Sequence, residues 1–396
     1  MHKPIAINKK IYWVGINDRE TDLFEAHWPL PKGVSYNAYL INDEKVALVD
    51  TVKTYFQTDY LDKIREIIGQ DKKVDYLIIN HMEPDHSGAI KEIKEVYPDI
   101  TIVGNKKTMN FLEGFYGIHE NVKVVEDGDV LDLGDHQLKF YLTPMVHWPE
   151  TMMTYDQTEG ILFSGDAFGG FGTLDGGIFD DELEVDFYED ETLRYFSNIV
   201  AKYSKMVQRA INKLGDLDIN VVAATHGPIW RENPEKIIND YVKWSSCKTE
   251  KGVVVVYGSM YGNTKKMAEE IARELAENGI EKIILHDVSR THTSFIVRDI
   301  WRYEAMILGS CTYNTQLFPP MEELVNFLEN IRVHDHRLGI FGSYSWSGGA
   351  VKRLKQFAEK VKCDLVEPVI ETKFSPKDED SEKCRQLGKN IAEKLK

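Results

Sequence analysis

The stretch from Asn80 to Gly88 concentrates side chains that could ligate a metal ion. It directly follows the apolar run 74–79, a pattern typical of a buried strand, and Pro84 with Ser87-Gly88 predicts a tight loop at its end. The ligating groups should therefore converge at the C-terminal edge of a strand. Four side chains of this stretch are candidate metal ligands, namely His81, Glu83, Asp85 and His86.

Three later segments each place one ligand-type residue after an apolar strand pattern. His147 follows residues 140–143, Asp166 follows residues 161–165, and His226 follows residues 221–224. A single histidine at a strand end is more often a structural residue than a ligand. Four strand-end positions in one chain instead favour a shared metal site.

The donor count indicates how many ions such a site would hold. Four imidazole nitrogens and three carboxylates make seven ligands, which is too many for one tetrahedral ion but suits two ions that share a bridging carboxylate. Two divalent ions carry four positive charges against three negative ones, so one bridging hydroxide would neutralise the site. A neutral site favours occupancy in a partly buried pocket, where uncompensated charge is expensive.

The pattern His81-x-Glu83-x-Asp85-His86, completed by His147, Asp166 and His226, resembles the metallo-β-lactamase fold, an αββα sandwich. The usual hydrolase motif of that fold is His-x-His-x-Asp-His. An oxygen ligand at the second position disfavours zinc and favours iron, and this departure marks the flavodiiron proteins. The resemblance implies one iron on His81, Glu83 and His147, a second on Asp85, His86 and His226, and Asp166 as the bridge.

Other residues near the predicted ligands match positions that line the diiron pocket in this family. Tyr195 and His27 are the candidate catalytic residues, because the resemblance implies that they orient bound gas or donate a proton. Trp148 stands beside a ligand, and Lys53 follows a predicted strand end. For Tyr195 and His27, ordinary packing or surface exposure is the alternative interpretation, and Trp148 and Lys53 are predicted only as neighbours of the ligands.

A second motif lies where strand 253–257 runs into a loop and then into a helix beginning near Lys265. Hydroxyls, a glycine and backbone N–H groups at a helix N-terminus can bind a phosphate. The loop resembles the phosphate loop of flavodoxins, Ser/Thr-x-Ser/Thr-Gly-x-Thr, with Tyr261 in place of the middle hydroxyl. Its candidate cofactor-binding residues are Ser259, Met260, Tyr261, Gly262, Asn263 and Thr264.

Two further loops at predicted strand ends complete a flavin site. Small residues there would let the backbone approach an isoalloxazine ring, and Tyr313, Tyr344 and Trp346 are candidates to stack on its faces. No second nucleotide-binding signature is present, so we expect FMN rather than FAD. The candidate residues of the two loops are Ser310, Thr312, Tyr313, Asn314, Ser343, Tyr344, Trp346 and Gly348.

These motifs divide the chain into two predicted domains of mixed α/β and α+β class. Residues 1–249 form a metallo-β-lactamase-like αββα sandwich that carries the diiron site. Residues 250–396 alternate strand and helix and form a flavodoxin-like, doubly wound, five-stranded parallel sheet that binds FMN. The expected strands of this sheet lie near 253–258, 282–288, 305–310, 337–342 and 365–371.

Composition excludes several other classes of protein. The net charge of −16 disfavours nucleic acid and anionic membranes as partners. No stretch is apolar enough to span a bilayer, and the N-terminus lacks a secretory signal, so we expect a cytoplasmic protein. The cysteines form no CxxC pair, which argues against disulfides and against thiolate-ligated metals. They are Cys247, Cys311, Cys363 and Cys384.

The resemblance covers essentially the whole chain and implies a reductive function. In flavodiiron proteins FMN passes electrons to a diiron centre that reduces O2 to water, NO to N2O, or both. Rubredoxin or reduced coenzyme F420 is the implied electron donor. A head-to-tail homodimer or a dimer-based tetramer is the implied assembly, and the absence of a rubredoxin-like CxxC segment indicates the minimal two-domain class.

Two alternatives remain at this point. One is a dinuclear zinc hydrolase with a fused flavodoxin domain, in which a metal-bound hydroxide attacks an ester or amide; Glu83 argues against it. The other is an electron-carrier module whose N-terminal domain only binds a partner. The complete set of seven ligand-type residues argues against this second alternative.

Overall fold

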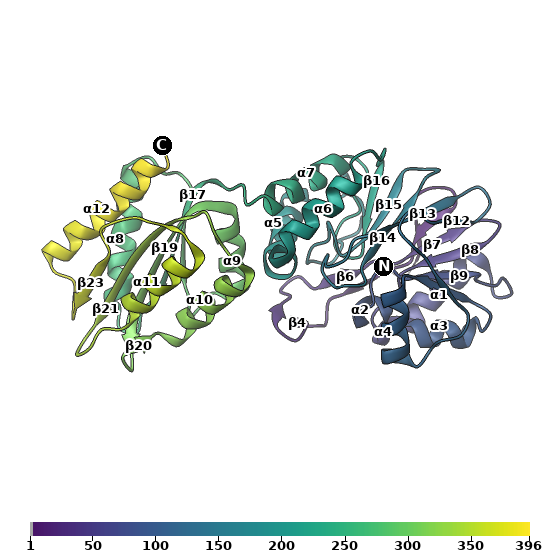
Figure 1. Cartoon of the computed structure of the whole chain (residues 1–396), viewed down its shortest axis with the longest axis horizontal. Helices are drawn as coiled ribbons and strands as arrows, with labels where there is room; N and C mark the ends of the chain where they lie inside the picture. The colour runs from purple at the N-terminus through teal and green to yellow at the C-terminus, as the bar shows by residue number, and fades with distance from the viewer. Residues whose placement is uncertain (1–2) are drawn as a thin grey trace. The chain divides into compact units, whose positions relative to one another are not determined.

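The computed structural model describes residues 3–396. The chain forms two compact units, which divide between Ser245 and Ser246. Figure 1 shows the N-terminal unit in purple to teal and the C-terminal unit in green to yellow. Among the described residues, no helix has the length and apolar character needed to cross a membrane.

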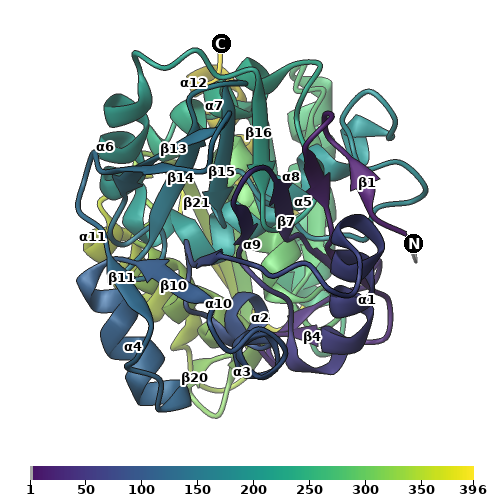
Figure 2. The same ribbon diagram turned by 90° about the vertical axis from the view of Figure 1, so that its right-hand side faces the viewer.

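Two β-sheets form the centre of the N-terminal unit. The first sheet has the strand order β1 (Ile5–Ala6), β2 (Ile11–Trp13), β7 (Tyr39–Asn42), β8 (Val46–Val49), β9 (Tyr76–Ile78), β10 (Thr101–Gly104), β11 (Val122–Val124). The second has the order β12 (Val130–Asp132), β13 (Gln137–Leu142), β14 (Met152–Asp156), β15 (Ile161–Gly165), β16 (Val221–Ala224), and Figure 2 shows its last four strands side by side. Two small antiparallel pairs are separate from these sheets: β3 (Ile16–Asp18) pairs with β6 (Val34–Tyr36), and β4 (Leu23–Phe24) pairs with β5 (Trp28–Pro29).

Helices cover the outer faces of both sheets, so the N-terminal unit is the predicted αββα sandwich (Figure 1). On the side of the first sheet lie α1 (Gln57–Ile68), α2 (Pro84–Ser87), α3 (Ile90–Val96) and α4 (Lys106–Tyr116). On the side of the second lie α5 (Val185–Tyr195), α6 (Ser204–Leu214) and α7 (Pro234–Ser245). A π-helical turn at Phe196–Val200 follows α5 and lies next to Tyr195.

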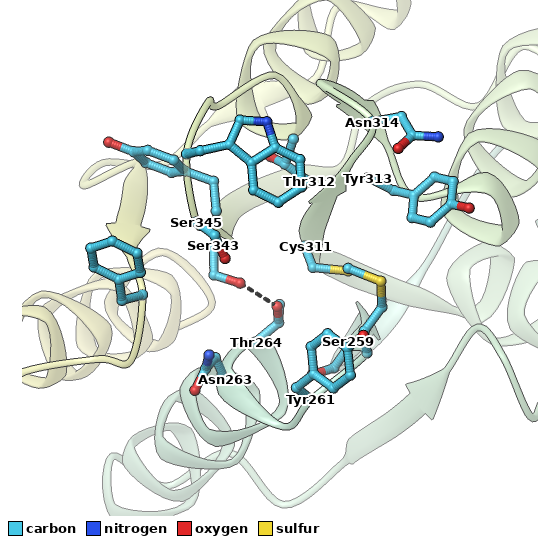
Figure 3. Close-up of a pocket in the computed structure, with 14 residues that line it drawn as sticks. Ser259, Tyr261, Asn263, Thr264, Cys311, Thr312, Tyr313, Asn314, Ser343 and Ser345 are labelled. Atoms are coloured by element: carbon cyan, nitrogen blue, oxygen red, sulfur yellow. Dashed lines mark hydrogen bonds between the residues drawn. The ribbon is translucent and has the colours of Figure 1, made fainter.

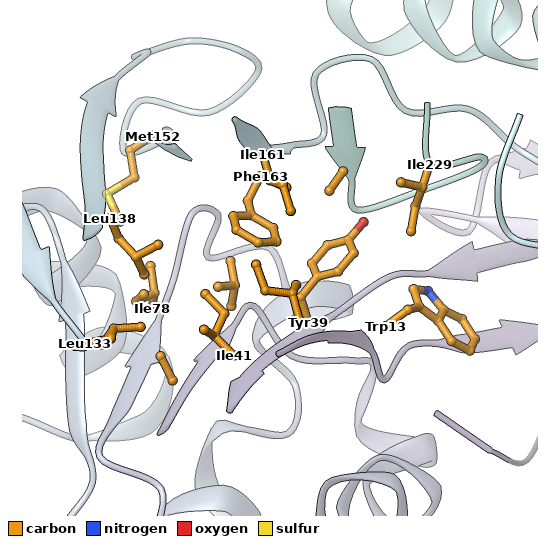
Figure 4. Close-up of a cluster of buried hydrophobic side chains, with 14 of the residues drawn as sticks. Trp13, Tyr39, Ile41, Ile78, Leu133, Leu138, Met152, Ile161, Phe163 and Ile229 are labelled. Atoms are coloured by element: carbon orange, nitrogen blue, oxygen red, sulfur yellow. The ribbon is translucent and has the colours of Figure 1, made fainter. Parts of the chain in front are cut away.

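The apolar core of this unit lies between the two sheets, where strand alternation turns large side chains inward (Figure 4). Tyr39 of β7 packs on Phe163 of β15 with their ring centroids 5.1 Å apart. The Tyr39 hydroxyl donates a hydrogen bond to the backbone oxygen of Ala224 at 2.5 Å. The core therefore also fixes the end of β16, from which the chain continues to His226.

The C-terminal unit is the predicted doubly wound parallel sheet. Its order is β18 (Ile283–Asp287), β17 (Glu250–Gly258), β19 (Tyr303–Tyr313), β21 (Arg337–Tyr344), β22 (Asp364–Leu365), and the neighbours in this order pair in parallel. The short β20 (Gln316–Leu317) pairs with β19 in the antiparallel sense. Four helices connect the strands, and α12 (Asp378–Lys394) follows the last strand. The connecting helices are α8 (Asn263–Glu277), α9 (Thr293–Arg302), α10 (Pro319–Ile331) and α11 (Ala350–Val361).

The fifth predicted strand, near 365–371, is interrupted in the structure. It forms two short strands, β22 and β23 (Ile370–Lys373), and both pair with β21. Pro368 lies between them and has no N–H with which to continue the hydrogen-bond ladder. After the break, β23 ends at Lys373, and the next residue, Phe374, lines the pocket described below.

Candidate metal centre and flavin pocket

The seven predicted ligand side chains come together in two groups within residues 3–396. In each group, one potential ligand atom from every residue lies within 4.8 Å of those of the others. These side chains lie at the C-terminal ends of β9, β15 and β16 and in the loop between β13 and β14. One group is His81, Glu83, His147 and Asp166, and the other is Asp85, His86 and His226.

The loop from His81 to His86 is anchored by buried polar contacts at both ends. Asp50 accepts hydrogen bonds from the Asn80 backbone N–H at 2.8 Å and from the Asn80 side chain at 3.0 Å. The Asn80 side-chain oxygen in turn accepts one from Thr154 of the second sheet at 2.7 Å. At the other end, the Thr51 hydroxyl donates to the His86 backbone oxygen at 2.7 Å. These contacts connect both sheets to the loop and restrict the positions of its ligand side chains.

Asp166 lies between the two groups and directs one carboxylate oxygen toward each. Its Oδ2 is 3.0 Å from His147 Nε2 and 3.4 Å from His81 Nε2. Its Oδ1 is 2.9 Å from His86 Nε2 and 3.7 Å from His226 Nε2. This geometry is what a carboxylate that bridges two ions requires.

The other two carboxylates divide between the groups. Glu83 Oε2 is 3.2 Å from His81 Nε2 and 3.3 Å from His147 Nε2. Asp85 Oδ2 is 3.3 Å from His86 Nε2 and 3.4 Å from His226 Nε2. Each carboxylate thus lies beside the two histidines with which the family resemblance associates it.

The donor atoms of the second group fit a cation better than they fit one another. The ring of His226 has its Nδ1 2.7 Å from the backbone oxygen of Ser35, which can only accept, so its Nε2 carries a lone pair. That Nε2 is 3.0 Å from His86 Nε2. Among residues 3–396, neither buried carboxylate oxygen of Asp85 has a hydrogen-bond partner. Buried polar atoms without partners are rare in native proteins, and a bound cation would satisfy these.

The electrostatics of the site also favour cations. Burial alone would lower the pKa of His147, but hydrogen bonds to Asp166 and Glu83 raise that pKa to about 9. The charges of Asp85 and Asp166 likewise raise the pKa of His86 to about 9 against the effect of burial. Burial would raise the pKa of Asp166, yet the surrounding histidines hold it well below its usual value. The carboxylates therefore create a strongly negative potential that metal ions can neutralise.

Three residues outside the predicted set contact the ligands directly. Glu150 Oε1 is 2.8 Å from His81 Nδ1, and the Thr225 hydroxyl donates to Asp166 Oδ1 at 2.6 Å. Ser35 supplies the carbonyl oxygen that faces His226. Thr225 could have been found from its position beside His226. Glu150 and Ser35 carry no such signal, because their roles depend on contacts between distant parts of the chain.

The predicted catalytic residue Tyr195 lies at the metal groups. Its hydroxyl donates to Asp166 Oδ2 at 3.0 Å, and its ring centroid is 5.5 Å from that of His226. Burial, with the charge of Asp166, raises the pKa of Tyr195 well above its usual value. The hydroxyl therefore stays protonated and can keep donating to the carboxylate.

The second predicted catalytic residue, His27, lies in the β4–β5 hairpin with its ring against Trp28, at a centroid distance of 4.2 Å. Glu25 of the same hairpin reaches the ligand Glu83. Desolvation, together with the charge and hydrogen bond of Glu83, raises the pKa of Glu25 to about 7. Sequence reasoning did not single out Glu25, which has no motif around it.

The remaining predicted neighbours also lie close to the ligands. The Trp148 ring centroid is 5.2 Å from that of His81. Lys53 lines a pocket of about 610 Å³ together with Glu83 and Asp85. The Lys53 ammonium is 5.8 Å from the centre of the Tyr36 ring, which lines the same pocket. This pocket gives small molecules a route toward two of the candidate ligands.

A second pocket, of about 210 Å³, lies at the C-terminal edge of the parallel sheet in the C-terminal unit (Figure 3). Eleven of the fourteen predicted flavin residues line it, together with Cys311, Ser345 and Phe374. The Thr264 and Ser343 hydroxyls lie 2.9 Å apart and connect the start of α8 to the end of β21. The eleven are Ser259, Met260, Tyr261, Asn263, Thr264, Thr312, Tyr313, Asn314, Ser343, Tyr344 and Trp346.

The other three predicted flavin residues have places beside the pocket rather than on its lining. Gly262 caps α8 with φ of 91°, a left-handed conformation that favours glycine. Ser310 is fully buried, and its hydroxyl donates to the Cys311 backbone oxygen at 2.9 Å. At Gly348 a Cβ atom would come within 2.6 Å of the Glu371 side chain. These residues shape the loops that carry the lining residues.

Together, the αββα unit with its paired histidine and carboxylate groups and the flavodoxin-like unit with its open pocket define a two-domain flavoprotein that carries a dinuclear metal site. The family model described as ODP family beta lactamase matches residues 34–227, and the flavodoxin model matches residues 255–388. The chain is 34% identical over 394 residues to the anaerobic nitric oxide reductase flavorubredoxin of Escherichia coli O1:K1, an alignment that covers 98% of this chain and 82% of that protein.

Solved structures agree with this classification. The rubredoxin oxygen:oxidoreductase of Desulfovibrio gigas matches with a TM-score of 0.95 and 30% identity, covering 99% of this chain and 98% of that chain. A mutant form of the flavo-diiron protein of Thermotoga maritima matches with a TM-score of 0.91 and 30% identity over the full length of both chains. The chain belongs to the flavodiiron protein family. The predicted fold and family are confirmed, and the cofactors are FMN and a diiron centre.

Proposed function

We propose that this protein is an oxidoreductase that passes electrons from FMN to a non-haem diiron centre and reduces O2 to water, NO to N2O, or both. The observation that carries the proposal is the geometry of Asp166, whose two oxygens face two separate ligand groups. The presence of Glu83 in the first group favours iron over zinc, because a carboxylate is a harder ligand than an imidazole. Family members named for nitric oxide reduction and for rubredoxin-linked oxygen chemistry support the same reaction class.

In this proposal each ligand group holds one iron and Asp166 holds both. His81, Glu83 and His147 serve the first ion, and Asp85, His86 and His226 serve the second. When bound, the iron pair supplies a redox-active centre with open positions for a diatomic gas, and the flavin supplies its electrons. The protein contributes the geometry of the donor atoms and their burial.

The residues around Asp166 hold the bridge in one orientation. Its two oxygens each accept one hydroxyl hydrogen bond, from Tyr195 at 3.0 Å and from Thr225 at 2.6 Å. We assign Tyr195 the role of keeping a proton beside the bridging carboxylate. Glu25 is a second carboxyl group at Glu83, and we assign it as a candidate proton carrier beside this group. His27, which lies in the β4–β5 hairpin with Glu25, remains a predicted proton donor.

In the C-terminal unit, the N-terminus of α8 faces the pocket and suits the phosphate of FMN. Asn263 and Thr264 begin this helix, and Ser259 precedes it. The loops after β19 and β21 would then contact the isoalloxazine ring, with Tyr313, Tyr344 and Trp346 at its faces. Gly262, Ser310 and Gly348 would support these loops from outside the pocket.

The electron donor and the assembly are part of the same proposal. Both pockets have exposed aromatic side chains at their rims: Tyr261 and Trp346 at the flavin pocket and Tyr55 at the metal pocket are 90%, 75% and 86% exposed. Such rims suit transient docking of rubredoxin, or access of reduced coenzyme F420, to the flavin. They also suit a head-to-tail homodimer or dimer-based tetramer, which sedimentation analysis of the holoprotein would detect.

The test is turnover of the reconstituted protein without air. The metal-free protein is loaded with Fe2+ and FMN, reduced, and mixed separately with O2 and with NO, and flavin reoxidation, water and N2O are measured. We expect two irons and one FMN per chain and rapid reoxidation by at least one gas. Metal analysis of the protein as purified, before the metal is removed, covers the alternative: two zinc ions without iron, combined with hydrolysis of an ester or amide, would overturn the proposal in favour of a hydrolase.

A further inference from the structure

The histidines of the two metal groups differ in what their outer ring nitrogens contact. His81 Nδ1 is 2.8 Å from a carboxylate oxygen of Glu150, whereas His226 Nδ1 is 2.7 Å from the backbone oxygen of Ser35. Among the residues that the structure describes, the Nδ1 atom of His86 has no hydrogen-bond partner. The first group therefore has an anionic outer partner, and the second has only a neutral one.

This difference changes how strongly each imidazole donates to a metal. A carboxylate and a carbonyl oxygen both accept a hydrogen bond from Nδ1–H, which leaves the Nε2 lone pair directed into the site. The hydrogen bond to the carboxylate is charge-assisted and roughly twice as strong as a neutral one. It draws the ring proton outward and makes Nε2 of His81 the more basic donor.

Glu150 is itself held rigidly and has little other charge compensation. Its Oε1 also accepts the Met82 backbone N–H at 3.0 Å, and its backbone oxygen accepts a hydrogen bond from Asn105 at 2.5 Å. The residue is 1% exposed, and its Oε2 has no hydrogen-bond partner within residues 3–396. A nearby cation stabilises a buried carboxylate whose charge is not otherwise compensated. A metal ion bound by Nε2 of His81 would be such a cation, because Glu150 contacts Nδ1 of the same ring.

Solvent access differs little between the two groups. The side chains of Glu83 and Asp85 are 11% and 12% exposed, that of His147 is 7% exposed, and those of His81, His86 and His226 are fully buried. The distances from each carboxylate to its two histidines are also alike, between 3.2 and 3.4 Å. The charge on Glu150 is thus the difference between the hydrogen-bond partners of the outer ring nitrogens in the two groups.

We propose that Glu150 is a positioning residue that makes the two metal positions unequal, so that the ion at His81, Glu83 and His147 binds first and more tightly than the ion at Asp85, His86 and His226. This inference rests on the ligand assignment of the proposed function, but it does not depend on which gas is reduced. It predicts stepwise loading of the metal-free protein. It also assigns a role to a residue that contacts no metal itself.

The test is a titration of the metal-free protein with Co2+ under nitrogen, in competition with a chelating indicator. We expect two successive stages for the natural chain. In Glu150→Gln, which keeps an oxygen that can accept from His81 but removes the charge, the first dissociation constant should rise about 10- to 100-fold. The second should change less than about threefold, so the two stages should merge.

A matched variant affects the other group. Ser35→Ala removes the hydroxyl that accepts the Gly227 backbone N–H at 2.8 Å beside His226. It should weaken only the second stage. Equal weakening of both stages by Glu150→Gln, or no weakening at all, would overturn the inference. Fewer than two bound Co2+ ions in the natural chain would instead reject the ligand assignment of the proposed function.

One measurement needs no variant and covers the case in which Glu150→Gln fails to fold. Crystals of the natural protein prepared with one equivalent of Co2+ should show anomalous scattering beside His81 and His147 and little beside His226. Equal peaks at both positions, or a stronger peak beside His226, would contradict sequential loading.

Discussion

The candidate metal centre and the flavin pocket differ in burial and in charge. The candidate metal centre buries its predicted ligands and surrounds them with charge: His81, His86 and His226 are 0% exposed, and Asp166 is 1% exposed. The flavin pocket is lined mainly by uncharged side chains and keeps Tyr261 and Trp346 largely exposed. One site depends on balanced charge, and the other depends on hydroxyls, backbone groups and an open face.

This difference follows from what each cofactor needs. Buried charges are tolerated only when they are paired and hydrogen-bonded, so every ligand of the metal centre needs partners from elsewhere in the fold. Asp166, for example, has two groups of histidines and two hydroxyl donors around it. A flavin that exchanges electrons with a separate protein or cofactor needs access instead, and an exposed rim provides it. Substitutions should therefore have large effects at the metal centre and smaller ones at the flavin pocket.

The largest expected effect is that of Asp166→Asn. An amide cannot bridge two cations as a carboxylate does, and it leaves the surrounding histidines without their shared counter-charge. We expect iron content to fall below one ion per chain and gas turnover to fall at least about 1,000-fold. Metal analysis and stopped-flow reoxidation measure both quantities.

Asp180→Asn is the control for this prediction. Asp180 is also a buried aspartate of the N-terminal unit, but its oxygens accept backbone N–H groups of Arg231, Glu232 and Asn233. It should lower stability without lowering iron content. Loss of iron in both variants to the same extent would show that Asp166 acts only through folding.

Glu83→His tests the metal preference rather than occupancy. This change restores the His-x-His-x-Asp-His pattern at residues 81–86 and replaces a hard oxygen ligand with a nitrogen. We expect the ratio of bound zinc to bound iron to rise about 100-fold in equilibrium dialysis against both ions, with FMN content unchanged. An unaltered ratio would mean that Glu83 does not select the metal.

A smaller effect is expected at the flavin pocket for Thr264→Val. The substitution keeps the shape of the side chain but removes the hydroxyl that lies 2.9 Å from that of Ser343. FMN affinity should fall about tenfold, which corresponds to about 1.4 kcal/mol, while iron content stays the same. Thr372→Val is the matched control, because the buried hydroxyl of Thr372 has no hydrogen-bond partner in residues 3–396. Flavin fluorescence titration of both variants measures the difference.

The smallest expected effect concerns a buried cation of the N-terminal unit. Lys63 donates to the backbone oxygen of Gly15 and lies 4.6 Å from the centre of the Trp13 ring, and burial lowers the pKa of Lys63 to about 8. Above pH 8 the unfolded chain holds this proton and the folded chain releases it, so stability rises with pH up to the unfolded pKa of 10.5. Between pH 8 and 9 the free energy of unfolding should gain about 1 kcal/mol.

Urea unfolding of the natural chain and of Lys63→Met tests this prediction. Methionine has no proton to lose, so the variant should lack this part of the rise between pH 8 and pH 9. Parallel pH curves for the two proteins would indicate that Lys63 titrates in the same range in the folded and unfolded chains.

Much of the candidate site could be read from sequence because its ligands stand at strand ends. Asn80 to Gly88 follows β9, Asp166 follows β15, and Thr225-His226 follows β16. An apolar run that stops at a polar residue is visible in one dimension, and the ends of neighbouring parallel strands meet at one edge of a sheet. Glu83 could also be interpreted in advance, because its position within a known motif carries chemical meaning.

Other features could not be read in this way. Glu150 and Ser35 are ordinary residues until the sheets bring them to His81 and His226, and Glu25 reaches Glu83 only because a hairpin folds over the pocket. Phe374 joins the flavin pocket because Pro368 divides the last strand and β23 pairs further along β21. In each case the contact joins segments far apart in the chain, and no local pattern encodes it.

By itself, the sequence determined the type and number of the candidate metal donors, the predicted phosphate loop and the order of the two domains, because these depend on residue chemistry and on local periodicity. Only the tertiary structure decided that Asp166 directs one oxygen to each ligand group and that a carboxylate faces one group while a backbone carbonyl faces the other. The strength of a ligand depends on the charges within a few ångströms of it. The packing of the two sheets against each other brings those charges close to the ligand. The distances between them cannot be read from the linear order of the residues.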